Sequence, residues 1–153
     1  MNYFLLIASP SEDIDGLSIS AIEMATRRLN SKSWGLWANT PHKKEIAPGD
    51  MLIVYVAGAK GKKFIATTTA SEVNFSGKAY LGDGNALTYP PCVVLRLKNT
   101  NYFENPLEIS GIKGKLDFIP QNVIRWGCVL QRGVKRISAK DARTILSCAN
   151  VSA

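Results

Sequence analysis

Short apolar runs along this chain predict the strands of a sheet. The first two runs hardly alternate with polar positions, which is typical of strands buried on both faces. A later run is rich in β-branched residues, which favour extended structure. Strands are therefore expected over residues 3–8, 51–57, 64–73, 92–98, 125–130 and 134–137.

Two segments have apolar residues at helical spacing. Residues 18–29 form the first, with Ser18 as the expected N-cap and the pair Asn30-Ser31 as the expected end. Residues 138–148 form the second, with a serine at the cap and an aspartate three positions later. A loose glycine-rich connection is expected over residues 77–85, and one or two short helical turns are expected over residues 104–119.

The order of these elements predicts an α+β fold. Strands outnumber helices, most connections suit antiparallel hairpins, and no βαβ series is visible. A chain of 153 residues with 46% hydrophobic content can bury a core of its own. We therefore expect a single domain over residues 1–153, built on a small curved sheet or barrel with helices packed at its ends.

The net charge of the chain indicates a possible kind of partner. The chain has 19 Lys and Arg against 12 Asp and Glu, a net charge of +7. Eight of the basic residues lie between positions 111 and 143, where only two acids balance them. A basic face fits a phosphate-rich partner, although a protein can also be basic without such a partner.

Cysteine usage and the N-terminus indicate a reducing, cytoplasmic setting. Cys92, Cys128 and Cys148 are widely spaced in apolar surroundings, so they are expected to be small buried side chains. The first apolar run has no basic region before it, which favours a strand over a signal peptide. No run approaches the roughly 20 apolar residues of a membrane helix, so no membrane association is expected.

Sequence patterns of catalysis are missing. His42 is the single histidine, no nucleophile elbow is present, and no spacing supplies a zinc site. Residues 58–63 resemble a phosphate loop only in part, because Val56 stands at a required glycine and Lys63 at the Ser/Thr position. We expect a protein that is not an enzyme and that needs no metal or cofactor.

One aromatic and polar segment remains to be explained. Trp34 and Trp37 are three apart, so in an extended segment they would point to opposite faces, one to the core and one to a cleft. Asn39 offers a paired donor and acceptor that matches the edge of a base, although asparagine in a turn also bonds its own backbone. His42 lies in a loop beside Lys43, and a histidine in such a position is more often a solvated residue than a catalyst.

These residues resemble the EVE domain family of the PUA-like superfamily. Trp34 and Asn39 match a Trp-x-x-x-x-Asn motif of one branch, and Gly49, Asp50 and Tyr55 match the strand that follows. Residues 3–12, 87–98 and 116–146 resemble the first strand, the Tyr-Pro strand entry and the closing segment of the family. The chain departs from that branch at Ala8 and Ser9, where the family has Ser and Glu, and it lacks an Arg-Leu-Ser-rich closing motif.

The resemblance implies a mixed β-barrel of five to six strands with flanking helices. It also implies a pocket that receives a flipped-out, chemically modified base of DNA or RNA. The base pocket would comprise Ser9, Trp34, Trp37, Asn39, His42, Tyr55, Tyr89, Pro90 and Trp126. Phosphates would be held by Lys43, Lys44, Lys62, Lys63, Arg125 and Arg132.

Three other functions stay open at this point. The chain could be a PUA-type RNA-binding module that ignores base modification. It could be a small-molecule binding domain or an enzyme that acts on a nucleotide-like ligand. It could also be a structural partner domain. A monomer is favoured.

Overall fold

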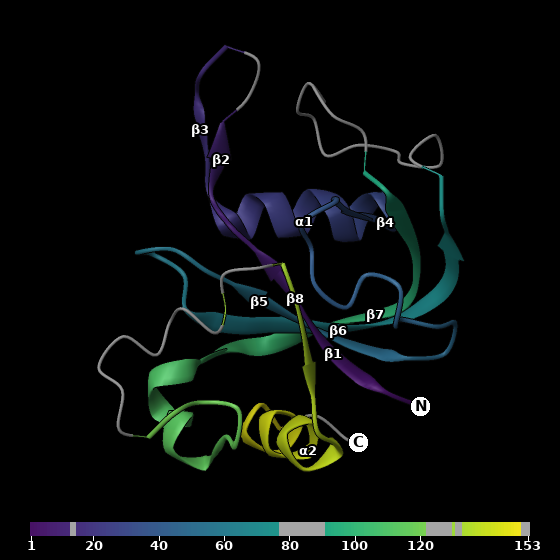
Figure 1. Cartoon of the computed structure of the whole chain (residues 1–153). Helices are drawn as coiled ribbons and strands as arrows, with labels where there is room; N and C mark the ends of the chain where they lie inside the picture. The colour runs from purple at the N-terminus through teal and green to yellow at the C-terminus, as the bar shows by residue number, and fades with distance from the viewer. Residues whose placement is uncertain (13–14, 77–90, 122–129, 131–132, 151–153) are drawn as a thin grey trace.

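A six-stranded sheet forms the centre of the molecule (Figure 1). The computed structural model describes residues 1–12, 15–76, 91–121, 130 and 133–150. The strand order across the sheet is β4-β7-β6-β5-β1-β8. Its strands are β1 (Tyr3–Ala8), β4 (Ser33–Leu36), β5 (Met51–Val56), β6 (Lys63–Asn74), β7 (Val93–Glu108) and β8 (Val134–Ile137).

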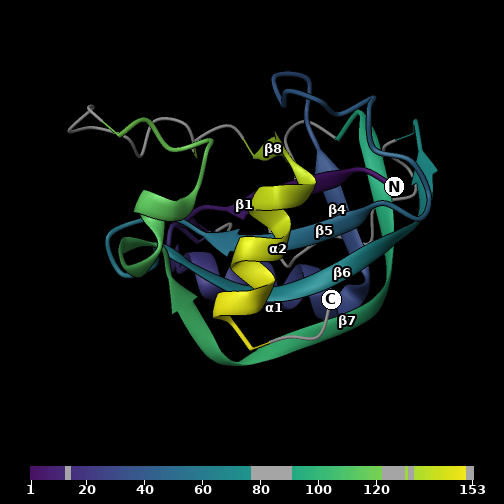
Figure 2. The same cartoon turned by 90° about the horizontal axis from the view of Figure 1, so that it is seen from below.

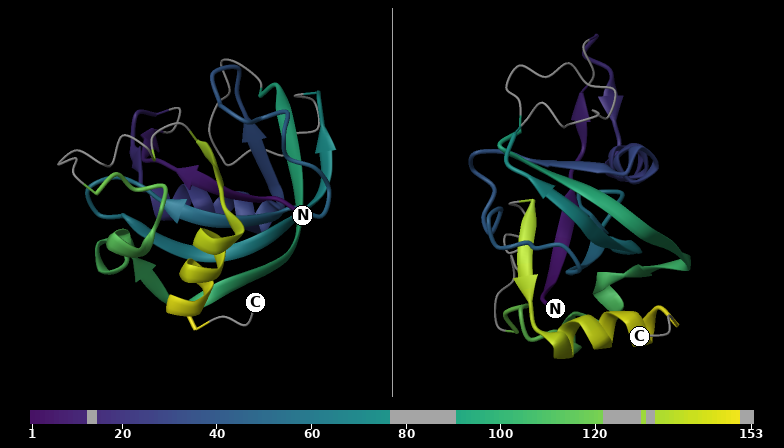
Figure 3. Two further views of the ribbon diagram at one scale, coloured as in Figure 1. Left: turned by 60° about the horizontal axis from the view of Figure 1, so that its bottom comes forward. Right: turned by 90° about the vertical axis from the view of Figure 1, so that its right-hand side faces the viewer.

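The sheet is mixed and strongly curled. β1 runs parallel to β5, and every other neighbouring pair is antiparallel. The two long strands β6 and β7 change register three times along their length, and such bulges bend a sheet. Figures 2 and 3 show the resulting half-barrel, which confirms the predicted α+β fold with a curved mixed sheet.

Both faces of the sheet are covered, which explains the continuous apolar runs. On β1, Phe4, Leu6 and Ala8 pack into one core with helix α1 (Ala21–Ser31), while Leu5 and Ile7 pack into a second core on the other side. That second core contains residues of helix α2 (Ala139–Cys148) and of the short turn η2 (Ile109–Gly111). It also contains Ile112 and Leu116, which flank the turn η3 (Lys113–Lys115). Figure 1 shows α1 and α2 on opposite sides of the sheet.

Helix α1 begins and ends later than the sequence pattern predicts. Its N-cap is Ser20, whose hydroxyl accepts from the N–H of Glu23 at 3.2 Å. Ser18, the expected cap, belongs instead to β3 (Ser18–Ile19), which pairs with β2 (Ser11–Glu12) in a separate two-stranded sheet. The helix continues to Ser31 and ends at Lys32 in the left-handed conformation, so the expected stop at Asn30-Ser31 is wrong.

The structure differs from three further expectations. β4 is a strand that the pattern did not predict, and β7 continues to Glu108, so helical turns begin only at Ile109. Cys92 is exposed, so its predicted burial is wrong, and Cys148 is partly exposed.

Some expectations lie outside the described residues: the connection at 77–85, most of the strand at 125–130, and Cys128. Neither described helix has the length and apolarity to cross a membrane.

Asp141 fixes the start of α2 to the segment before it. Its side chain is 1% exposed and accepts from the N–H groups of Asp117 at 2.9 Å and Phe118 at 3.2 Å. Its own N–H donates to the hydroxyl of the N-cap Ser138 at 3.1 Å. One carboxylate therefore satisfies two backbone donors from the segment that follows η3, as well as lying in the first turn of the helix.

Asp141→Ala is expected to lower the free energy of unfolding by about 2–4 kcal/mol, because it leaves those two N–H groups without their acceptor. Chemical denaturation measures this loss. Asp117→Ala is the matched control, since the Asp117 carboxylate pairs with Lys140 at 3.3 Å on the surface and should contribute less than about 1 kcal/mol. Equal losses for the two variants would contradict this role of Asp141.

Candidate nucleic-acid interface

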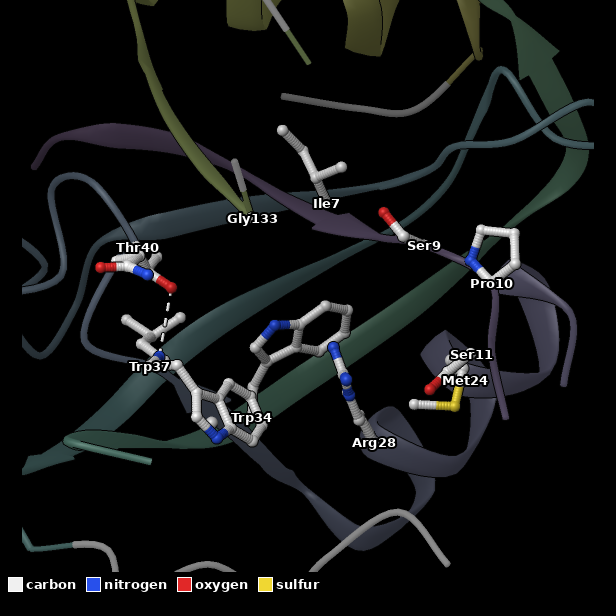
Figure 4. Close-up of a pocket in the computed structure, with 13 residues that line it drawn as sticks. Ile7, Ser9, Pro10, Ser11, Met24, Arg28, Trp34, Trp37, Thr40 and Gly133 are labelled. Atoms are coloured by element: carbon white, nitrogen blue, oxygen red, sulfur yellow. Dashed lines mark hydrogen bonds between the residues drawn. The ribbon is translucent and has the colours of Figure 1, made fainter. Parts of the chain in front are cut away.

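A cavity of about 740 Å³ lies where the two edges of the sheet approach each other. β4 forms one edge, and Gly133, which directly precedes β8, lies at the other. Helix α1 and the end of β1 complete the walls (Figure 4). The lining residues are Ile7, Ser9, Pro10, Ser11, Met24, Arg28, Trp34, Gly35, Leu36, Trp37, Asn39, Thr40 and Gly133.

Trp34 belongs to the core and to the cavity at once. It lies on β4 opposite Leu95 of β7, and it is 1% exposed. Its indole packs in the core cluster that contains α1. Since it also lines the cavity, it serves as the buried floor of the site and is not an open platform.

Trp37 is more exposed than Trp34 and lies in the turn that follows β4. Its N–H donates to the hydroxyl of Thr40 at 3.1 Å, and the N–H of Thr40 donates to its carbonyl at 3.0 Å. The ring of Trp37 lies on the side of β4 to which a side chain at Gly35 would point, which is opposite to the side of the neighbouring Trp34. Both indoles lie within 6 Å of the same guanidinium, at 5.0 and 5.9 Å.

Gly35 makes room for the Trp37 ring. A Cβ atom at Gly35 would lie 2.9 Å from Cη2 and 3.1 Å from Cζ3 of that ring, and 3.1 Å from Cβ of Pro91. The ring therefore rests against the backbone of β4, where any side chain would displace it.

Gly35→Ala is expected to move Trp37 and to cost about 1–3 kcal/mol of stability, as overpacking does. Thermal unfolding and the near-ultraviolet dichroism of the tryptophans measure the two effects. Gly111→Ala is the control, because nothing lies within 4 Å of a Cβ at that glycine. An unchanged aromatic spectrum for Gly35→Ala would show that Trp37 does not depend on this contact.

Arg28 is the main cavity residue that sequence reasoning missed. It is half-buried on α1, and its guanidinium lies over Trp34 at 5.0 Å and near Trp37 at 5.9 Å. Figure 4 shows its side chain rising from the helix beside the indole of Trp34. A signal was available: Arg28 follows Met24 by four positions and precedes Leu29, so it continues the buried face of the helix.

Of the residues predicted for the base pocket, four line this cavity and two do not. Ser9, Trp34, Trp37 and Asn39 come together there. His42 lies in the loop beyond, and Tyr55 lies in the other core. Tyr89, Pro90 and Trp126 lie outside the described residues.

His42 and Tyr55 have other partners. The ring of His42 pairs with the carboxylate of Glu45, which also accepts from Arg136 at 3.1 Å. The hydrogen bond from His42, helped by Arg136, holds the pKa of Glu45 below its usual range. Tyr55 is 2% exposed, with its ring 5.1 Å from that of Phe64, and burial raises its pKa to about 12.

None of the described residues that were predicted to bind phosphate lines the cavity. The Nζ of Lys43 donates to the carbonyl of Ala38 at 3.0 Å, which places this cation beside Asn39. Lys44 is exposed in the same loop, while Lys62 and Lys63 lie where β6 begins. Arg125 and Arg132 lie outside the described residues. Within the described part of the chain, no three metal-binding side chains gather into a site.

Comparisons with known proteins find similarity in structure alone. No family model matches the sequence, and no curated protein matches it. The DUF55 domain of human thymocyte nuclear protein 1 has a TM-score of 0.63 at 9% identity, covering 98% of this chain and 99% of that chain. Human THYN1 in complex with 5-methylcytosine-containing DNA has a TM-score of 0.62 at 8% identity, with 100% of both chains covered. The N-terminal domain of Staphylothermus marinus McrB has a TM-score of 0.50 at 16% identity, covering 95% and 93%.

The curled mixed sheet and its two covering helices define a PUA-like fold, as the sequence resemblance implied. The likeness to the DUF55 domain, which extends over nearly all of both chains, makes this fold EVE-like. The prediction of an EVE-like domain is confirmed at the level of the fold.

Proposed function

We propose that this chain is a nucleic-acid-binding domain that takes one flipped-out base of DNA or RNA into the cavity beside Trp34 and Trp37. The observation that carries the proposal is the cavity itself, in which two indoles, an asparagine and an arginine meet at the seam of the sheet. The shared fold with human THYN1, which was solved with 5-methylcytosine-containing DNA, supports it. The net charge of +7 suits a polyanionic partner.

The energy balance requires contacts outside the pocket. Drawing one base from the stack costs a few kcal/mol, and stacking on an aromatic side chain returns roughly 1–3 kcal/mol. A buried methyl group adds only about 0.8 kcal/mol. Basic residues near the rim, such as Lys43, must supply the remainder through phosphate contacts, which release counterions.

Binding without catalysis is the form that we propose. The described lining residues include the hydroxyls of Ser9, Ser11 and Thr40, but no histidine or carboxylate that could act as a base. His42 is engaged with Glu45. The described lining residues therefore include groups that can hold and orient a ring, but not the pair of groups that activates a nucleophile.

Titration of labelled oligonucleotides tests the proposal. Single- and double-stranded DNA and RNA of one sequence would each carry cytosine or 5-methylcytosine at one position. We expect tighter binding of the modified form. With about three phosphate contacts, affinity should fall roughly forty-fold between about 50 and 200 mM salt. Equal affinity for both bases would overturn recognition of the methyl group while leaving general binding intact, and a preference for structured RNA regardless of modification would identify an RNA-binding module instead.

A further inference from the structure

Arg28 gives the cavity a positive charge that the indoles alone would not provide. It is the single charged side chain among the described lining residues. Its neighbours in the lining are neutral: two indoles, the Asn39 amide and the hydroxyls of Ser9, Ser11 and Thr40. The inference below rests on the proposed function, because it concerns the ligand of the same cavity.

The guanidinium already occupies the aromatic surface. It lies 5.0 Å from the centroid of Trp34 and 5.9 Å from that of Trp37, both within the range of cation–π attraction. A neutral ring that stacks directly on Trp34 must first displace this cation. A ring that carries an oxygen acceptor toward the guanidinium can instead enter beside it and leave both cation–π contacts in place.

The geometry of a stacked guanidinium determines what it can recognise. Its five N–H donors lie in the plane of the group and match two oxygen acceptors side by side. A carboxylate is the strongest such partner, since both hydrogen bonds are then charge-assisted. A methyl group at the same position of a base offers the donors nothing.

We infer that the cavity selects a flipped base carrying an in-plane, anionic oxygen group, and that Arg28 reads this group. An oxidised pyrimidine with a ring carboxylate is the ligand class that fits. Asn39 then contacts the ring edge, and Trp37 covers part of the ring face.

Three oligonucleotides test this inference. They share one sequence and differ at one position, which is cytosine, 5-methylcytosine or 5-carboxylcytosine. At fixed salt and pH 7, the wild-type protein should bind the carboxyl form about tenfold more tightly than the methyl form. A methyl form that binds as tightly as the carboxyl form, and more tightly than cytosine, would overturn this inference and leave the proposed function standing. Equal binding of all three would overturn both.

Two variants of Arg28 and one variant of its neighbour Arg27 distinguish recognition of the base from a general effect of positive charge. Arg28→Gln should bring the carboxyl-to-methyl ratio close to one, and Arg28→Lys should leave an intermediate ratio, because it keeps the charge and loses the planar fork. Arg27→Gln removes the same charge from the same helix, where Arg27 pairs with Glu23 at 2.9 Å, and should keep the ratio.

A phosphate contact by Arg28 predicts a different result. All three oligonucleotides would then lose affinity equally in Arg28→Gln, with the ratio unchanged, and that outcome would overturn the inference. Thermal unfolding identifies any variant that is not folded. Should Arg28→Gln prove unfolded, Arg28→Lys decides, because a ratio equal to wild type in that variant would also overturn it.

Discussion

Trp34→Ala is expected to lower the free energy of unfolding by about 3–5 kcal/mol, as removal of a buried aromatic side chain does. Trp34 is 1% exposed and packs in the larger core cluster with α1 residues such as Leu29. Its removal opens a void between β4 and the helix, and it also takes away the ring over which Arg28 lies. Urea denaturation monitored by far-ultraviolet dichroism measures the loss.

Leu36→Ala provides a comparison for that void. Leu36 is equally buried on the same strand and in the same cluster, but its side chain is smaller. It should cost about 2–5 kcal/mol and leave the Arg28–Trp34 contact in place. If Trp34→Ala and the wild type unfolded at the same midpoint concentration of urea, the ring would not be part of the core.

Trp37→Ala is expected to leave the domain folded and to weaken binding of a modified-base oligonucleotide by about 1–3 kcal/mol. That range corresponds to roughly 5- to 150-fold in the dissociation constant. The reason is that Trp37 is only half-buried, in a turn held by its backbone bonds with Thr40, so its ring serves the cavity more than the core. Fluorescence anisotropy of a labelled oligonucleotide measures the change.

Phe75→Ala is the matched control for this loss. Phe75 is an aromatic residue that is 65% exposed and does not line the cavity, so its removal should leave affinity within about twofold. A loss of equal size in the two variants would mean that aromatic surface acts nonspecifically. Loss of the fold in both Trp34→Ala and Trp37→Ala, with no binding by the wild type, would favour a structural partner domain.

Local rules predicted most of the strands and the N-cap of α2, and tertiary pairing decided the rest. The runs that became β1, β5 and β6 were visible because both faces of the sheet are covered. The cap of α1 was misplaced because Ser18 and Ser20 are both good caps, and the choice depends on Ser18 pairing with Glu12 across the β2–β3 hairpin. β4 was missed because a four-residue strand with a glycine has little pattern of its own.

The candidate site was predictable where its residues lie close together in sequence. Trp34, Trp37 and Asn39 share one segment, and the turn at Thr40 brings them to one cavity. Tyr55 was placed there by resemblance, but its position on β5 directs it into the opposite core with Phe64. Arg28 was missed although it continues the buried face of α1, because its contact with Trp34 on β4 depends on how the helix packs.

The pairing of β8 with β1 has a consequence for folding during translation. Tyr3 lies opposite Ile137, and the N–H of Ile7 donates to the carbonyl of Gly133 at 2.8 Å. The seam where the cavity lies therefore needs residues that are translated more than a hundred positions apart. A nascent chain can assemble β5 with β6, but this cavity is complete only after the last strand has emerged.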